Sequence, residues 1–185
     1  MRVGSLVAFG NDQFAAAIGG QGADEAMAIY RETFRPSAGL SRPHATVCVW
    51  ALAADTDEAA WHLFESRARW RMDRNVGRLT ALYPPEEAVS EYTPAEEHAL
   101  MALRANALVG TGEQVAAKLR ALAKRLDVEE VAVITWTHDP QAQRRSYQLL
   151  AQAMPRSITN ISHCCFAGCC GCEHVCHFVF LSKFS

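Results

Sequence analysis

The chain has 185 residues, with 20 acidic residues against 18 Lys and Arg, and half of all residues are apolar. This balance is typical of a globular domain and disfavours a disordered chain or a strongly basic nucleic-acid-binding protein. No apolar stretch reaches the roughly 18 residues that a membrane-spanning helix needs. The short apolar patch after Arg2 is interrupted early by polar residues, which disfavours a secretory signal.

Cysteine usage divides the chain. Six of the seven cysteines lie between Cys164 and Cys176, and only Cys48 precedes them. A secreted domain held by disulfides spreads its cysteines over the parts that they join, so the main body is expected to be a reduced, cytoplasmic protein. Cys48 lies within an apolar run and is expected to be a small core residue.

The first part of the chain predicts two strands with a helix between them. Residues 3–9 form a short apolar segment, and a glycine-rich connection leads to a helix over residues 24–34 with apolar positions at helical spacing. Residues 45–53 are apolar almost throughout, which is typical of a strand buried on both faces of a parallel sheet. Asp55 is the N-cap candidate of the next helix, which extends to about Asp73.

The second part predicts three more helices and one more strand. After an irregular insertion over residues 77–92, Thr93 opens one helix and Thr111 another, each with a capping-box pattern. Residues 130–136 are predicted to be a strand, and Asp139 caps the last helix. The alternation of buried strands with helices predicts a parallel sheet built from right-handed βαβ units.

Two loops carry candidate functional groups. Gly110 and Thr111 precede a helix, where backbone N–H groups and the helix dipole favour a phosphate, although an ordinary helix cap is the simpler interpretation because no Gly-Lys-Ser/Thr follows. His138 follows the last predicted strand, at the edge where parallel barrels place their active sites. Histidine suits proton transfer because it titrates near neutral pH, but no nucleophile or second base accompanies His138.

Arginines gather in two of the predicted helical segments. A solvated helix face is their expected environment, and a phosphate or nucleic-acid role is the alternative. These arginines are Arg67, Arg69, Arg71, Arg74, Arg144 and Arg145.

The composition changes abruptly after Pro155, which divides the chain into a body, residues 1–155, and a Cys/His-rich tail, residues 156–185. Structural zinc sites need four Cys or His, usually as two separated pairs, whereas the ligands of this tail are adjacent or one residue apart. One bound ion or a thiolate cluster is one interpretation of the tail. The other interpretations are a disordered, non-globular tail and a segment that is not native to the domain. The candidate metal ligands are Cys164, Cys169, Cys172 and Cys176.

Four segments in this order resemble a known family. Over about residues 3–154, the chain is similar to the C-terminal half of the bacterial luciferase-like flavin-dependent monooxygenases. The family usually has a proline where Gly112 stands, which a helix N-terminus tolerates. The segments are Tyr30-Arg31-Glu32-Thr33-Phe34-Arg35-Pro36-Ser37, Ala53-Ala54-Asp55-Thr56-Asp57-Glu58-Ala59, Val109-Gly110-Thr111-Gly112-Glu113-Gln114-Val115, and His138-Asp139 with Arg145-Ser146-Tyr147.

The resemblance implies an α/β fold that is a partial (β/α)8 TIM barrel, roughly its last three βα units, because a whole barrel needs about 250 residues. It also implies an oxidoreductase that uses reduced FMN, or a deazaflavin, with O2 and a small organic substrate. By the same resemblance, Phe9 and Gly10 lie near the flavin ring, and Gly110 and Thr111 lie near the loop of the last unit. No catalytic base is carried over.

An open piece of a barrel leaves strand edges unpaired and inner faces uncovered. We therefore expect self-association through these edges and weak or no flavin turnover. Two alternatives from other classes stay open: a non-catalytic fragment that acts as an interaction partner, and a metal-binding module centred on the tail.

Overall fold

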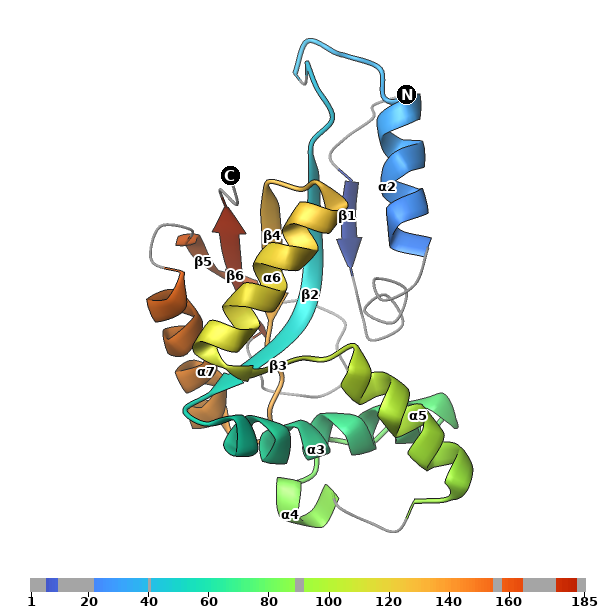
Figure 1. Ribbon diagram of the computed structural model, residues 1–185, viewed down its shortest axis with the longest axis vertical. Coiled ribbons are helices and arrows are strands. Elements are labelled where there is room, and N and C mark those ends of the chain that lie inside the picture. Colours follow the sequence, from blue (N-terminus) through green and yellow to red (C-terminus); the bar gives the residue numbers. More distant parts are fainter. Residues whose placement is uncertain are drawn as a thin grey trace.

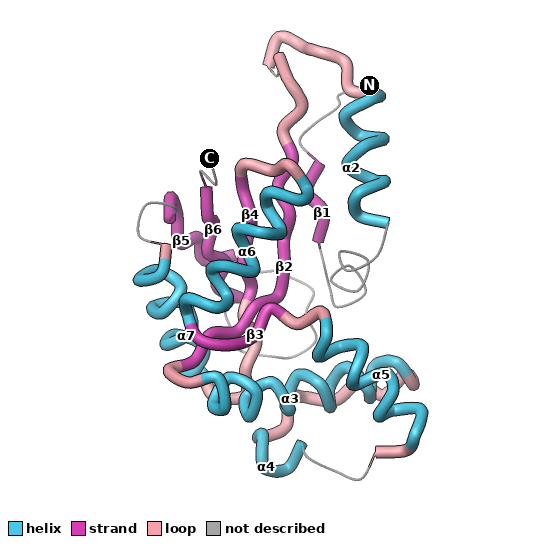
Figure 2. The backbone as a smooth tube through the Cα atoms, viewed as in Figure 1, coloured by secondary structure: helices cyan, strands magenta, loops and turns pink. Residues whose placement is uncertain are grey.

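The computed structural model describes residues 6–9, 22–39, 41–88, 92–154, 158–164 and 176–182. Helices and strands alternate along most of this part of the chain (Figures 1 and 2). In chain order the elements are β1 (Leu6–Phe9), α2 (Gly22–Thr33), β2 (Ala45–Ala54), α3 (Asp57–Asn75), α4 (Pro85–Ala88), α5 (Pro94–Ala105), β3 (Leu108–Thr111), α6 (Gly112–Leu126), β4 (Glu130–Ile134), α7 (Pro140–Ala153), β5 (Ile158–Cys164) and β6 (Cys176–Ser182).

The long strand β2 is the centre of the sheet. Its first half pairs in parallel with β1 over residues 45–48 and with β4 over residues 46–50. Its second half, residues 51–54, pairs in parallel with β3. The predicted parallel sheet with a buried central strand is therefore confirmed, while the short strand β3 lies in a segment that the sequence pattern assigned to a loop.

Helices α6 and α7 cover one face of this sheet (Figure 1). The side chains of β2 that face them are small and apolar, such as Val47 and Ala51, and both are completely buried. The predicted apolar stripe of α6 packs here. Its members Val115, Leu119, Leu122 and Leu126 are all buried.

The opposite face of the sheet is covered by the long insertion between β2 and β3. Figure 1 shows α3, α4 and α5 gathered beyond the carboxyl end of β2. Cys48, Trp50 and Leu52 of β2 pack on this side against Phe64 and Ala68 of α3. Cys48 is the core residue that the sequence predicts, and burial raises its pKa to about 11.

Local capping signals fix most helix starts. The capping boxes at Thr93 and Thr111 form as predicted, and the carboxylate of Asp139 accepts hydrogen bonds from two backbone N–H groups of α7. The prediction of Asp55 as a cap was wrong. The hydroxyl of Thr56 accepts from the backbone N–H of Ala59 at 3.1 Å instead, because the carboxylate of Asp55 is bound by a side chain of α7.

Two strands extend the sheet beyond β4. Strand β6 pairs antiparallel with β4, and β5 pairs antiparallel with β6. Both strands lie within residues 156–185, for which disorder is predicted, and residues 178–181, Phe-Val-Phe-Leu, have high strand propensity beside the edge of β4. The division of the chain at residue 155 stays a prediction. Within the described ranges, no helix is both long and apolar enough to cross a bilayer.

Candidate functional site

The carboxyl ends of the parallel strands lie at one edge of the sheet, and α7 fastens two of them. The backbone N–H of Ala53 in β2 donates to the buried hydroxyl of Ser146 at 2.9 Å. The backbone N–H of Thr135, which follows β4, donates to the hydroxyl of Tyr147 at 2.9 Å. The side-chain amide of Gln143 donates to the carbonyl of Thr135 at 2.6 Å. The strand ends are therefore positioned by three neighbouring side chains of a single helix.

An ion pair closes the same edge at the surface. The Nε of Arg145 in α7 donates to both carboxylate oxygens of Asp55 at 3.1 Å. Hydrogen bonds from Arg145 lower the pKa of Asp55 below its ordinary value, and the same pairing raises the pKa of Arg145. Both side chains are about half exposed, so this pair orients the loop after β2 and contributes little stability by itself.

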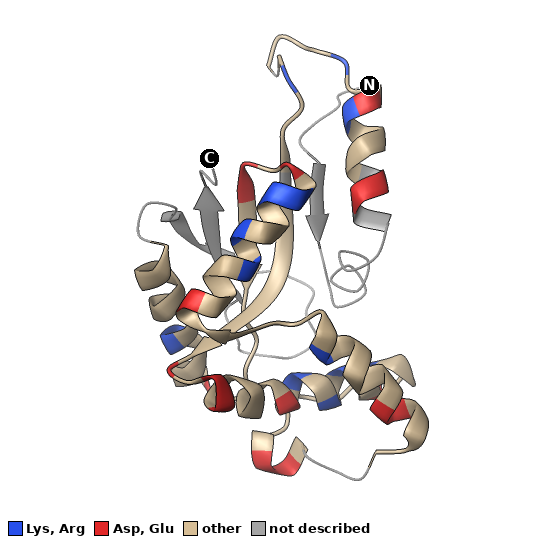
Figure 3. Ribbon diagram, in the orientation of Figure 1, with Lys and Arg blue, Asp and Glu red and all other residues tan. Residues whose placement is uncertain are grey.

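His138 lies in the loop after β4 and is exposed. Near it, Nε2 of His62 in α3 lies 3.2 Å from Oε1 of Glu86 in α4. The pKa of Glu86 is lowered, first by the hydrogen bond that its carboxylate accepts from its own backbone N–H and second by the contact with His62. The charge of His138 acts in the same direction. Figure 3 shows the acidic residues of α4 at this end of the molecule. These three side chains form a solvent-accessible cluster of titratable groups.

Gly110 and Thr111, the last two residues of β3, form the cap of α6. The backbone N–H of Thr111 donates to Oε1 of Gln114 at 2.7 Å, and the hydroxyl of Thr111 accepts from the backbone N–H of Gln114 at 3.4 Å. Gly110 has φ +148, and a Cβ at this position would collide with the Gln114 side chain. The simpler of the two sequence interpretations therefore describes the geometry, and the hydroxyl of Thr111 is engaged within its own loop.

The other predicted positions lie at the margins of the described structure. Phe9 is the last residue of β1, opposite Cys48, and Gly10 lies outside the described residues. Cys164 and Cys176 are opposite each other in β5 and β6, whereas the other two candidate metal ligands, Cys169 and Cys172, lie outside the described residues. Among the described residues, no group of three or more His, Cys, Asp or Glu is placed to hold a metal ion.

The largest departure from the sequence prediction is Arg67. It was assigned to a solvated helix face, but its side chain is 2% exposed. Its guanidinium carbon lies 4.7 Å from the ring centroids of both Trp70 and Trp136 and 5.2 Å from that of Trp50. Arg71 is also buried, contrary to the same prediction. The indoles come from α3, β2 and the loop after β4, so spacing in the sequence could not indicate their meeting.

Within the described part of the chain, several buried polar atoms have no hydrogen-bond partner, and two of them, on this side of the sheet, belong to almost fully buried residues outside the guanidinium of Arg67. They are Nε1 of Trp50 and Oγ of Ser66, in residues that are 5% and 1% exposed. Leaving a buried donor unsatisfied costs about 1–3 kcal/mol. Native proteins keep few such atoms, and each one is a reason to look for a ligand or a further polypeptide segment. A further candidate site is therefore the indole cluster, which consists of Arg67, Trp50, Trp70 and Trp136.

Comparisons with known proteins agree with this architecture. No family model matches the chain. It is 35% identical over 142 residues to the uncharacterized protein YwcH of Bacillus subtilis (strain 168), a match that covers 76% of this chain and 43% of that protein. It is 30% identical over 126 residues to a protein of Escherichia coli (strain K12) named luciferase-like monooxygenase, with 68% of this chain and 38% of that protein covered.

A solved structure shows the same fold. The crystal structure of apo-MsnO8 superimposes with a TM-score of 0.65 at 23% sequence identity, and the match covers 84% of this chain and 53% of that one. The chain therefore belongs to the luciferase-like family. It spans less than half the length of the curated relatives that it matches.

Proposed function

We propose that the chain forms the closing units of a (β/α)8 barrel in a flavin-dependent monooxygenase, which inserts one atom of O2 into a small organic substrate. The observation that carries this proposal is the asymmetry of the parallel sheet. Helices α6 and α7 cover one face, as the outer helices of such a barrel do. The opposite face has the buried Nε1 of Trp50, which finds no hydrogen-bond partner among the described residues, beside Ile134, the last residue of β4.

The residues of this face fit a flavin. The N–H of Trp50 can donate a hydrogen bond to the ring system, and the neighbouring indoles exclude water. When bound, a reduced flavin supplies the electrons that activate O2. FMN and a deazaflavin both present hydrogen-bond acceptors at one edge of a planar ring system, so both are proposed as cofactors.

Individual residues have separate parts in this proposal. His138 is the candidate for moving a proton, since it is exposed at the carboxyl end of β4. Phe9 and Gly10 are proposed near the flavin ring, by resemblance alone. Gly110 and Thr111 are proposed to cap α6. The hydroxyl of Thr111 already accepts a hydrogen bond within this cap, so we do not propose that it holds a phosphate. The protein is proposed to act in the cytoplasm.

The direct test is a titration of oxidised FMN with the full chain while flavin fluorescence is followed. We expect saturable quenching of the emission of oxidised FMN at micromolar concentrations of the chain. A deazaflavin cofactor titrated in parallel identifies the preferred ring system. Fluorescence that falls only in proportion to added protein, without saturation, would reject the flavin proposal.

A second candidate is a non-catalytic partner that joins other polypeptide chains by strand pairing. The observation that favours it is the position of β1, which among the described residues pairs only with β2. A free edge of this kind is a template for a further strand. Concentration-dependent association of the purified chain, in the absence of any flavin binding, would favour this candidate.

A further inference from the structure

Strand β4 has neighbours of opposite direction on its two edges. It pairs in parallel with β2, which in turn pairs in parallel with β1, whereas its pairing with β6 is antiparallel. In a closed (β/α)8 barrel every strand has two parallel neighbours, and the last strand pairs with the first. Strand β6 therefore occupies the position at which a parallel strand would pair with β4 in the barrel proposed above.

Strand β6 covers this edge along its whole length. All five residues of β4, from Glu130 to Ile134, have partners in β6, from Ser182 to Phe178. Strand β5 pairs with the other side of β6, with an irregular register near its start. While this hairpin is in place, the backbone groups on this edge of β4 cannot pair with another strand.

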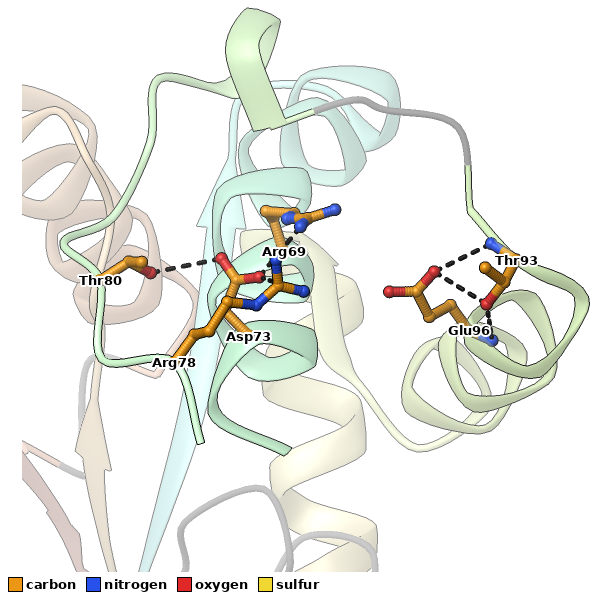
Figure 4. A network of polar contacts seen from close by, with 6 residues as sticks. All are labelled: Arg69, Asp73, Arg78, Thr80, Thr93 and Glu96. Atoms are coloured by element: carbon orange, nitrogen blue, oxygen red, sulfur yellow. Dashed lines mark hydrogen bonds and ion pairs between the residues drawn. The ribbon is translucent and has the colours of Figure 1, made fainter. Parts of the chain in front are cut away.

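The hairpin is joined to the body more simply than the elements of the body are joined to one another. At the carboxyl end of α3, the buried carboxylate of Asp73 contacts Arg69 at 3.0 Å and Arg78 at 3.4 Å (Figure 4). The hydroxyl of Thr80 donates to the same carboxylate at 3.3 Å. Within the described residues, the strand pairing between hairpin and body is the single ladder of β6 and β4. An element held in this way can open while the rest stays folded, and a two-stranded hairpin is only marginally stable alone.

The relatives indicate to what a parallel strand at this edge would belong. More than half of each of the two curated relatives described above lies outside its match with this chain. In a barrel, the units that precede the closing ones begin with the strand that pairs with the last strand. A polypeptide with these opening units offers a parallel strand with helices on one face, which continues the arrangement of β1, β2 and β4.

We propose that the edge of β4 is a docking site for a parallel strand of a separate polypeptide that carries the opening units of the barrel, and that the hairpin of β5 and β6 is a detachable plug of this site. Opening of the hairpin exposes the backbone groups of β4, and the incoming strand pairs with them. Only chains with an open hairpin can bind, so their fraction sets the apparent affinity. This inference rests on the barrel proposed above, and it does not depend on the cofactor.

The probe for this site is the amino-terminal part of YwcH, up to the start of its match with this chain. It is coexpressed with the full chain and purified through a tag on the probe. We expect a complex with one copy of each polypeptide, whose mass is measured by light scattering. Intact YwcH is the control and is expected not to bind, because it already contains a segment that matches this chain.

Val179→Pro tests the plug. Val179 lies opposite Val133 in the ladder, and a proline has no backbone N–H and is not tolerated within a paired strand. A labelled chain is used to displace the unlabelled chain from the purified complex. We expect Val179→Pro to bind the probe at least about tenfold more tightly than the parent chain, because no hairpin has to be displaced. Val179→Thr keeps the backbone N–H and a β-branched side chain, and is expected to stay within about twofold of the parent.

Hydrogen exchange of the full chain without the probe tests the opening independently, and it decides on the plug if circular dichroism shows that Val179→Pro does not fold. We expect the backbone N–H groups of β6 to exchange at least about tenfold faster than those of β2, because local opening exposes them. Equal protection of β6 and β2, or equal binding by the parent chain and a folded Val179→Pro, would overturn the plug.

The outcomes separate this inference from the flavin proposal. A complex with the probe that forms although FMN does not bind supports the docking site and rejects only the use of flavin. Saturable FMN binding by the chain without any complex leaves the flavin proposal standing and overturns the docking site. Binding of intact YwcH as tight as that of the probe also overturns it, since the open strand of the probe is then not what is recognised.

Discussion

Single side chains in the segments that mark the family resemblance join elements of the fold to one another. The hydroxyl of Tyr30 in α2 accepts from the backbone N–H of His44 and donates to its carbonyl, at 3.3 and 3.0 Å. Arg31 donates to the carbonyls of Leu126 and Asp127 at 2.5 and 2.6 Å, at the carboxyl end of α6. Tyr30 and Arg31, which belong to a segment that carries the family resemblance, therefore support the fold. The residues proposed to bind a ligand lie outside this segment.

Ser146 provides a test of this joining role. Replacing it with alanine leaves the buried N–H of Ala53 without its acceptor, which is expected to lower the free energy of unfolding by about 1–3 kcal/mol. Urea denaturation measures the change. Gln148→Ala on the exposed side of the same helix is the control and is expected to stay within about 0.5 kcal/mol of the parent chain. Equal effects of the two changes would contradict the role given to Ser146.

The pair of Asp55 and Arg145 predicts a pH dependence. Because Arg145 lowers the pKa of Asp55 in the folded chain, folding favours the ionised carboxylate. This stabilisation is fully present above the ordinary carboxyl pKa of about 3.9 and is lost as the pH falls through the lowered value. The difference in urea midpoint between the parent chain and Asp55→Asn should therefore be smaller at about pH 3 than at about pH 7. A difference that grows on acidification would refute this assignment.

At the scale of elements, α6 and α7 approach closely where α6 begins. A Cβ on Gly112 would lie 2.9 Å from the carbonyl oxygen of Leu149 in α7, a contact that the capping pattern, which tolerates the family's proline at this position, does not reveal. Gly112→Ala is therefore expected to separate the helices and to lower the free energy of unfolding by about 1–3 kcal/mol. Thermal or urea denaturation measures this change.

Gly39 offers the comparison for this substitution. A Cβ there has no atom within 4 Å, so Gly39→Ala should be neutral or stabilising by up to about 1 kcal/mol through the unfolded chain. If both alanine variants are equally stable, the close approach at Gly112 does not restrict the packing of α6 on α7.

The sequence predicts those elements whose signals are local. Helix starts at Thr93, Thr111 and Asp139 follow from side chains that bond to backbone groups two or three residues away. Strand β3 has no such signal, because its four residues Leu-Val-Gly-Thr include a glycine and their pairing depends on β2, more than 50 residues earlier. The burial of Arg67 likewise depends on indoles from three separate segments.

The candidate sites, like the elements, divide into those that a local sequence signal predicts and those that depend on distant residues. The sequence places His138 after a strand and offers the cap interpretation of Gly110 and Thr111, and both follow from residues adjacent in the chain. The indole cluster was missed. Its available signal was a tryptophan at position 50 in a strand of otherwise small or aliphatic residues, together with an arginine in the middle of an apolar helix face. Those patterns mark an unusual pair without showing that the two residues meet.

At the scale of the whole molecule, the hairpin of β5 and β6 occupies the edge of β4. A chain that ends at residue 155 loses this pairing and presents the backbone groups of β4 to solvent. We expect such a chain to associate more strongly than the full chain, with a mass by light scattering that increases with concentration. A truncated chain that remains a monodisperse monomer would show that the hairpin does not protect this edge.

The position of β2 has a consequence for how the polypeptide is made. Strands β3 and β4, which pair with β2, are both encoded after it, and the serine that accepts from Ala53 lies 93 residues downstream. During synthesis on the ribosome, the face of β2 that packs against α6 and α7 must therefore stay exposed until those helices have emerged. Chains dominated by such distant contacts fold slowly, so holding chaperones are expected to bind the nascent chain at this strand.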